Sequence, residues 1–163
     1  MRGLKTLPLR VRQQCNNAQL LANWLATRPE IAHVNYPGLP THPQHTLAER
    51  LFNGQGSGGV LSFEIKEAQR ADVFRFMEAL QLCLPATSLG DIYTLVLHPA
   101  TSSHRTLTPD EREQVGIREG LLRLSAGIED VIDIRQDLEQ ALEKINIKDS
   151  KHKGHKGHYV KKD

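Results

Sequence analysis

One segment of the chain, residues 120–130, reads Gly120-Leu121-Leu122-Arg123-Leu124-Ser125-Ala126-Gly127-Ile128-Glu129-Asp130. Its leucines predict a buried strand over residues 121–125, and the acidic pair that follows the small residues predicts the first turn of a helix. A single arginine lies inside the apolar run. Because burying a guanidinium is costly unless an anion meets it, we expect Arg123 either to form an internal ion pair or to bind a carboxylate ligand.

Outward from this segment, the hydrophobic spacing alternates between the periods of helices and strands. It predicts helices over residues 6–27, 43–52, 67–80, 108–116 and 129–147, and strands over residues 31–36, 60–65, 81–87, 91–97 and 121–125. Thr108-Pro109-Asp110-Glu111 has the pattern of a capping box with proline at the first helical position. This order of elements predicts an α+β fold, with a small sheet and helices packed on one face.

Three regions are expected from this pattern. Residues 1–28 form a connecting helix, residues 29–147 form the α+β domain, and residues 148–163 form a basic His/Lys tail that we expect to be disordered. A long helix directly after the first methionine suggests that a partner domain is missing.

The net charge of +2 is misleading as a guide to partners, because the tail alone holds six lysines against two aspartates. The remaining residues carry a small net negative charge, so the composition argues against a nucleic-acid-binding surface. No apolar run approaches the length of a membrane span, and the N-terminus lacks the apolar core of a secretory signal. Cys15 and Cys83 are isolated, which favours buried thiols in a reducing compartment. These observations predict a soluble, cytoplasmic protein.

Other candidate sites are weaker. The glycine-rich stretch 54–59 precedes a strand and lacks the Gly-Lys-Ser/Thr ending of a phosphate-binding loop, so a flexible connector is expected. The histidines His33, His42, His45, His98 and His104 lack a zinc-ligand spacing with cysteine or carboxylate, so no metal site is predicted. No Gly-x-Ser-x-Gly elbow surrounds any serine, which argues against a hydrolase. Ser88 is expected to be a turn residue whose hydroxyl or backbone can meet a ligand.

Six separated segments, taken in order, match one protein family. The segments are Arg2–Arg10, Val34–Leu39, Gly58–Glu64, Ser88–Asp91, His98–Ala100 with Ser103–His104, and Arg123–Asp130. On these segments the chain resembles the C-terminal small domain of the Cys/Met-metabolism enzymes, fold-type I enzymes that use pyridoxal 5'-phosphate (PLP). The family includes cystathionine γ-synthase, cystathionine γ-lyase, methionine γ-lyase and O-acetylhomoserine sulfhydrylase.

The resemblance implies a role for three residues. In this family the arginine of the Arg-Leu-Ser motif holds the α-carboxylate of the amino-acid substrate, which here corresponds to Arg123. Ser88 and Leu89, in the matching Ser-Leu-Gly turn, are implied in the same substrate-binding site. The activity implied is PLP-dependent γ-elimination or γ-replacement on sulfur amino acids or O-acyl homoserine.

The chain departs from the family in two respects. The Schiff-base lysine of the family lies in a Ser-x-Thr-Lys motif, and none of the lysines here has those neighbours. The resemblance therefore implies no catalytic and no cofactor-binding residue in this chain, no turnover without the missing large PLP domain, and a homo-oligomer for the complete enzyme. Tyr93 also stands where many members carry a glutamate. The alternative to a part of a PLP-dependent enzyme is that the chain is a stand-alone, non-catalytic binding or oligomerisation module.

Overall fold

The computed structural model describes residues 2–152, in which five strands form one mixed sheet with the order β1-β2-β5-β4-β3. All neighbouring strands are antiparallel except β3 and β4, which are parallel. The strands are β1 (Ile31–Asn35), β2 (Val60–Ile65), β3 (Leu84–Pro85), β4 (Leu95–Leu97) and β5 (Leu121–Ser125). The segment around Arg123 therefore forms the central strand, as its apolar character predicts.

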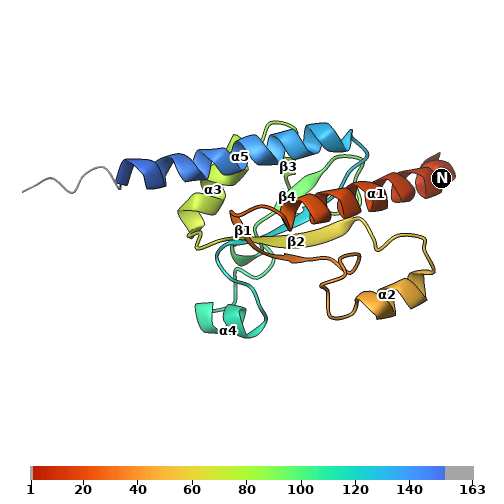
Figure 1. Ribbon diagram of the computed structural model, residues 1–163, viewed down its shortest axis with the longest axis horizontal. Helices are drawn as coiled ribbons and strands as arrows, with labels where there is room; N and C mark the ends of the chain where they lie inside the picture. The colour runs from red at the N-terminus through yellow and green to blue at the C-terminus, as the bar shows by residue number, and fades with distance from the viewer. Residues whose placement is uncertain (1, 153–163) are drawn as a thin grey trace, which may run out of the picture.

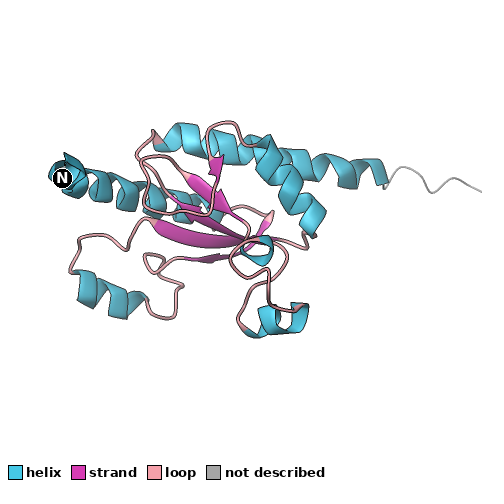
Figure 2. Cartoon of the chain, turned by 180° about the vertical axis from the view of Figure 1, so that it is seen from behind, coloured by secondary structure: helices cyan, strands magenta, loops and turns pink. Residues whose placement is uncertain are grey.

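The long helices cover one face of this sheet, and the short helices lie in loops on the other side (Figures 1 and 2). The long helices are α1 (Leu7–Leu25), α3 (Arg70–Ala79) and α5 (Val131–His152). The short elements on the other side are α2 (His45–Phe52), α4 (Pro109–Gln114) and the 3-10 helix η2 (Pro99–Thr101), whereas the 3-10 helix η1 (Arg2–Thr6) directly precedes α1. The predicted α+β fold, with the main helices on one face of a small sheet, is confirmed.

The core lies between the sheet and the long helices, and it follows from the alternation of side chains along the strands. Leu61, Phe63, Leu122 and Leu124 are buried against α1, α3 and α5 in one apolar cluster. The rings of Phe63 and Phe76, for example, meet edge to face with 6.1 Å between their centroids. The intervening side chains of β2 and β5 consequently point to the opposite, more open face, and Arg123 is one of them.

The two predicted strands on either side of Ser88 are much shorter than expected. Residues 81–87 and 91–97 contribute only β3 and β4 to the sheet. The reason is that side chains occupy the backbone donors outside these strands. The carboxylate of Asp137 accepts the N–H groups of Gln81, Leu82 and Cys83 at 2.8–2.9 Å, and Glu129 accepts the N–H of Thr94 at 2.6 Å.

Helix boundaries differ from the sequence expectation by a few residues. Helix α3 begins at Arg70 because Gln69 is extended, with a ψ of 167°, and forms a capping box with Asp72. The capping box of α4 forms as predicted, since the side chain of Thr108 accepts the N–H of Glu111. Helix α5 continues beyond Ile147 to His152. The rest of the predicted tail, residues 153–163, lies outside the described residues.

The glycine-rich connector is held against its surroundings at three points. The hydroxyl of Tyr36 donates to the carbonyl of Gly58 at 2.9 Å, and the N–H of Ala126 donates to the carbonyl of Gly59 at 2.8 Å. Gly56 has a φ of 94° and lies so close to Cys15 that an added Cβ would come within 3.2 Å of the sulfur. The connector is therefore packed onto α1. Cys15 and Cys83 are free, buried thiols, as the sequence predicts.

Candidate substrate-binding site

Arg123 lies in the middle of β5, directly opposite Ser62 of β2 on one side and Leu97 of β4 on the other. Its side chain projects from the face of the sheet that the long helices leave open, so it is half-buried and not enclosed in the core. None of the ion pairs among the described residues includes it. Of the two expectations for Arg123, the internal ion pair is therefore not formed.

The guanidinium of Arg123 is bound to backbone carbonyls on one side only. Its Nη2 donates to the carbonyl oxygens of Thr87 at 3.1 Å and Ser88 at 2.8 Å, which uses both hydrogens of that nitrogen. The Nε atom is buried without a partner, and within the described residues Nη1 makes no hydrogen bond. The arrangement therefore brings Arg123 and Ser88 together and leaves Nη1 as the donor available to an anion.

A hollow of about 440 Å³ lies on the open face of the sheet beside Arg123. Its walls come from β1, β2, β4 and β5 and from the loops around α2, η2 and α4. Among its lining residues are Asn35, His42, Ser62, Leu97, His104, Ile117 and Arg123. The lining mixes apolar and polar side chains around one permanently charged side chain, Arg123, and such a concave surface with few charged groups is suited to a small ligand. A larger hollow of about 700 Å³ lies between α1 and residues 54–57, away from Arg123.

The loop between β3 and β4 carries the other predicted site residues. Ser88 is exposed, and its carbonyl, as described, accepts a hydrogen bond from Arg123. The side chain of Leu89 is 57% exposed and does not line the hollow. The backbone of Ser88 therefore contacts Arg123 directly. Leu89 is near Arg123 only as the next residue of the same turn.

Two side chains that follow Arg123 in the sequence anchor this loop. The Oγ of Ser125, 1% exposed, accepts the N–H of Gly90 at 2.9 Å. The carboxylate of Glu129 accepts both the N–H and the hydroxyl of Thr94, at 2.6 and 2.9 Å. The hydroxyl oxygen of Thr94 in turn accepts the N–H of Gly127 at 3.0 Å. Strand β5 and the turn after it thus fix the middle and the end of the loop.

Helix α1 supplies further anchors to the same region. Gln14 donates to the carbonyl of Asp91 at 2.6 Å, and Asn17, which is fully buried, donates to the carbonyls of Gly127 and Glu129 at 3.1 and 2.8 Å. These supporting residues were not predicted from the sequence. A polar residue at a buried position of an otherwise apolar helix stripe, such as Asn17, is the one signal that pointed to them.

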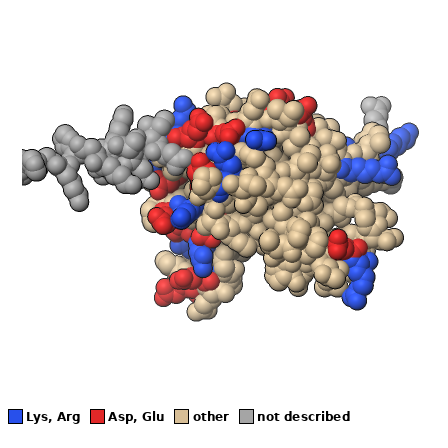
Figure 3. All heavy atoms as spheres, in the orientation of Figure 1, with Lys and Arg blue, Asp and Glu red and all other residues tan. Residues whose placement is uncertain are grey.

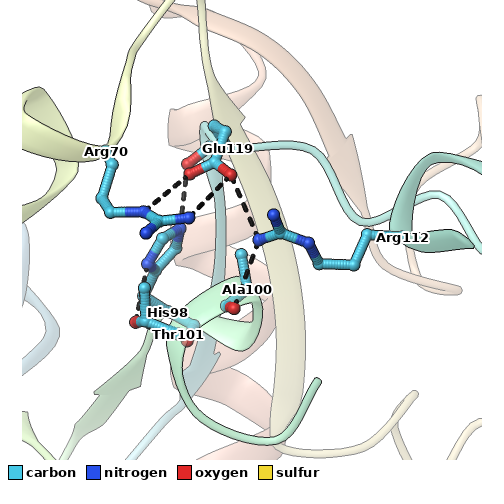
Figure 4. A network of polar contacts seen from close by, with 6 residues as sticks. All are labelled: Arg70, His98, Ala100, Thr101, Arg112 and Glu119. Atoms are coloured by element: carbon cyan, nitrogen blue, oxygen red, sulfur yellow. Dashed lines mark hydrogen bonds and ion pairs between the residues drawn. The ribbon is translucent and has the colours of Figure 1, made fainter. Parts of the chain in front are cut away.

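A second polar cluster surrounds Glu119 at the opposite end of β5 (Figure 4). Glu119 binds Arg70 and Arg112 at 3.1 Å each, and its carbonyl lies 2.9 Å from Nε2 of His98. Hydrogen bonds from Arg70 lower the pKa of Glu119, while burial lowers the pKa of His98. Both ring nitrogens of His98 are bound, the second one to Thr101 at 3.0 Å. This cluster has the character of a structural network.

Two further histidines, His42 and His45, also have local partners. Nδ1 of His45 lies 2.8 Å from the carbonyl of Pro37, and Nδ1 of His42 accepts the N–H of Gln44 at 3.1 Å. Within residues 2–152, no group of three His, Cys, Asp or Glu side chains is placed to hold a metal ion. No helix in that part of the chain is long and apolar enough to cross a membrane.

Charged side chains are unevenly distributed over the face in Figure 3. Over the described residues of the face in Figure 3, acidic and basic side chains are mixed on the α3–α5 side, and basic side chains gather near the start of α1. The lining of the Arg123 hollow contains no lysine. Arg123 is the permanently charged side chain of this hollow, and a guanidinium has the planar fork geometry that can bind a carboxylate.

Comparison with known proteins places the chain among PLP-dependent enzymes. It is 49% identical over 142 residues to the L-methionine gamma-lyase of Pseudomonas putida, covering 87% of this chain and 35% of that enzyme. A crystal structure of cystathionine gamma synthase from Xanthomonas oryzae pv. oryzae, in complex with aminoacrylate and cysteine, superimposes with a TM-score of 0.80 at 39% identity, over 90% of this chain and 37% of that one.

A further structure, an O-acetylhomoserine (thiol)-lyase of Campylobacter jejuni, carries an N'-pyridoxyl-lysine-5'-monophosphate residue. It matches with a TM-score of 0.82 and 38% identity, over 87% of this chain and 33% of that chain. The chain thus spans about a third of the length of these relatives. The model of one family matches residues 1–143. On this match, the chain belongs to the family of Cys/Met metabolism PLP-dependent enzymes.

Proposed function

We propose that this chain is the substrate-carboxylate-binding part of a PLP-dependent enzyme that carries out γ-elimination or γ-replacement on sulfur amino acids or O-acyl homoserine. The observation that supports this most strongly is the state of Arg123. It lines a hollow on the open face of the sheet, has no acidic partner among the described residues, and keeps Nη1 available. A guanidinium in this state is suited to bind a carboxylate.

The chemistry of this part of the enzyme is binding and orientation. Arg123 holds the α-carboxylate, and the Ser88 loop, bound to the same guanidinium, limits the directions from which the substrate enters. Fixing the carboxylate reduces the orientations open to the reacting carbon, which is a recognised contribution to catalysis. PLP, when bound by the complete enzyme, supplies the electron sink for the reaction.

Catalysis also requires residues that this chain does not contain. None of its lysines lies in a Ser-x-Thr-Lys motif, so the Schiff base with PLP is assigned to the large domain of the complete enzyme. We therefore expect the chain to be inactive alone. Exposed apolar residues at the start of the chain, Leu4, Leu7, Leu9 and Val11, are consistent with a surface that the rest of a homo-oligomeric enzyme covers.

A chimera tests the proposal directly. The matching third of the Pseudomonas putida L-methionine gamma-lyase is replaced by this chain, and PLP-dependent consumption of L-methionine and O-acetylhomoserine is followed by mass spectrometry. We expect turnover by the chimera and none by the chain alone. A folded, PLP-loaded chimera that consumes neither substrate would contradict the assigned role.

The isolated chain provides a complementary test. It is mixed with PLP, reduced with borohydride and weighed by intact-mass spectrometry. We expect no stoichiometric adduct at a single lysine. An adduct at one defined lysine would show that the chain has a cofactor site of its own and would favour an autonomous enzyme. A stable oligomer of the isolated chain, measured by light scattering, would instead favour the stand-alone oligomerisation module.

A further inference from the structure

The hydroxyl group of Ser125 anchors the loop between β3 and β4, and this contact bears on ligand binding. Ser125 ends β5, two residues after Arg123, so both side chains leave the same face of the strand. Its side chain is almost completely buried, and its Oγ accepts the N–H of Gly90 at 2.9 Å. A buried hydroxyl with a defined backbone partner fixes the position of that partner.

Gly90 belongs to the turn that also contains Ser88. The carbonyl of Ser88 binds Nη2 of Arg123 at 2.8 Å, so the turn is attached to β5 at two points, through Arg123 and through Ser125. Gly90 adopts a φ of 76°, and the turn itself is exposed from Thr87 to Tyr93. An exposed turn with a glycine in this conformation depends on such attachments for a defined position.

The two attachments have different consequences for ligand binding. An anion can bind to Nη1 directly, but a carboxylate held by both terminal nitrogens of Arg123 would displace Nη2 from the carbonyls of Thr87 and Ser88. The contact between Ser125 and Gly90 involves no group that the substrate is expected to touch. It can therefore hold the turn in place whether Arg123 binds the carbonyls or a carboxylate.

We infer that Ser125 is a positioning residue, whose hydroxyl holds the Ser88–Gly90 turn against Arg123 and thereby sets the affinity of the carboxylate site. The inference rests on the proposed function for the link to affinity. The placement of the turn by Ser125 does not depend on it.

The test uses the ¹⁵N-labelled chain, the Ser125→Ala variant, and Ser125→Thr, which retains the hydroxyl. Ser102→Ala is the matched control, because it also removes one hydroxyl hydrogen bond, the one to the carbonyl of His98 at 2.6 Å, away from the turn. Two quantities are measured by NMR: hydrogen exchange of the Gly90 amide, and the apparent Kd for L-methionine from shifts of the Ser88–Gly90 amides. The first is a direct measure of the hydrogen bond.

We expect a protected Gly90 amide in the unmodified chain and loss of this protection in Ser125→Ala. The same variant should raise the apparent Kd for L-methionine about 2- to 10-fold, the effect of one hydrogen bond. Ser125→Thr should retain the Gly90 protection, and Ser102→Ala should leave both quantities unchanged.

Three results would overturn the inference. The first is that the Gly90 amide of the unmodified chain exchanges as fast as a free amide. This result can be observed without any variant. The second is loss of Gly90 protection with an unchanged Kd, and the third is an equal effect of Ser102→Ala. If the unmodified chain gives no saturable shift with L-methionine, the proposed function fails at this site, whereas Gly90 exchange still decides whether Ser125 places the turn.

Discussion

Nη2 of Arg123 donates to the carbonyl oxygen of Ser88 across 2.8 Å, although 35 positions separate the two residues in the chain. The contact joins the central strand of the sheet to the turn between β3 and β4. Arg123 and Ser88 lie in two of the segments that carry the resemblance to the PLP-dependent family. The candidate site is therefore a product of the fold, which brings a cation and an exposed turn to one face of the sheet.

Asp137 is predicted to make a pH-dependent contribution to stability. Its carboxylate is buried, which alone would raise its pKa, but the N–H groups of Cys83, Gln81 and Leu82, together with Gln140, lower it overall. Since the folded pKa lies below the unfolded one, this contribution is present above the unfolded pKa of about 3.9 and is lost as the pH falls through the folded pKa.

The measurement is urea unfolding of the chain and of Asp137→Asn between pH 7 and pH 3. At pH 7 the free energy of unfolding of Asp137→Asn should be lower by about 1.5–3 kcal/mol, the range for hydrogen bonds to a charged group. The difference between the two proteins should shrink as the pH falls. A constant difference across this range would mean that the charge of Asp137 does not contribute.

Gly127 is predicted to tolerate no side chain. An added Cβ would lie 2.5 Å from the carbonyl carbon of Tyr93 and would also collide with the carbonyl of Ile92 and the carboxylate of Glu129. Gly127→Ala should therefore destabilise the chain by about 1–3 kcal/mol, as in other overpacked sites. It should also weaken the hydrogen bond from the N–H of residue 127 to the hydroxyl oxygen of Thr94. Gly3→Ala is the control, since its nearest contact is at 3.7 Å. Thermal unfolding of both variants measures the difference, and equal stability would contradict the predicted clash.

The two arginines bound to Glu119 are predicted to have unequal effects. Arg112 has a side chain that is only 8% exposed, whereas that of Arg70 is 50% exposed. Arg70→Ala should have little effect on stability, because exposed ion pairs are weak. Glu119→Gln should cost about 1–3 kcal/mol, because it removes the charge that compensates the buried Arg112. Denaturant unfolding of both variants tests the order, and a larger loss for Arg70→Ala would reverse it.

The sequence predicts the elements whose pattern is local. Strands β2 and β5 begin and end where their apolar residues indicate, and the capping box of Thr108 and Glu111 forms as expected. The lengths of β3 and β4 could not be predicted, because they depend on carboxylates of Glu129 and Asp137 that lie at least 35 positions away.

The site was predictable only to the level of its motifs. The motif around Arg123 identifies the cation. Because the leucines on both sides predict a buried strand, however, the sequence suggested that the Arg123 side chain is enclosed in the core. The alternation of β5 places those leucines in the core and Arg123 on the open face. The backbone partners of Arg123, and the anchoring by Ser125 and Asn17, depend on tertiary contacts that no local pattern contains.

The most direct test of the central claim is the kcat/KM for L-methionine of the chimera with Arg123→Ala, compared with the unmodified chimera. Arg118→Ala is the matched control, since the Arg118 side chain is 65% exposed and pairs with Glu64 at 3.5 Å. Removing one partner of a buried charged pair costs about 2–5 kcal/mol of binding free energy. Arg123→Ala should therefore lower kcat/KM at least about 30-fold, with a higher KM, whereas Arg118→Ala should have little effect. An Arg123→Ala chimera that keeps the kcat/KM of its parent would contradict the assignment of Arg123 to the substrate carboxylate.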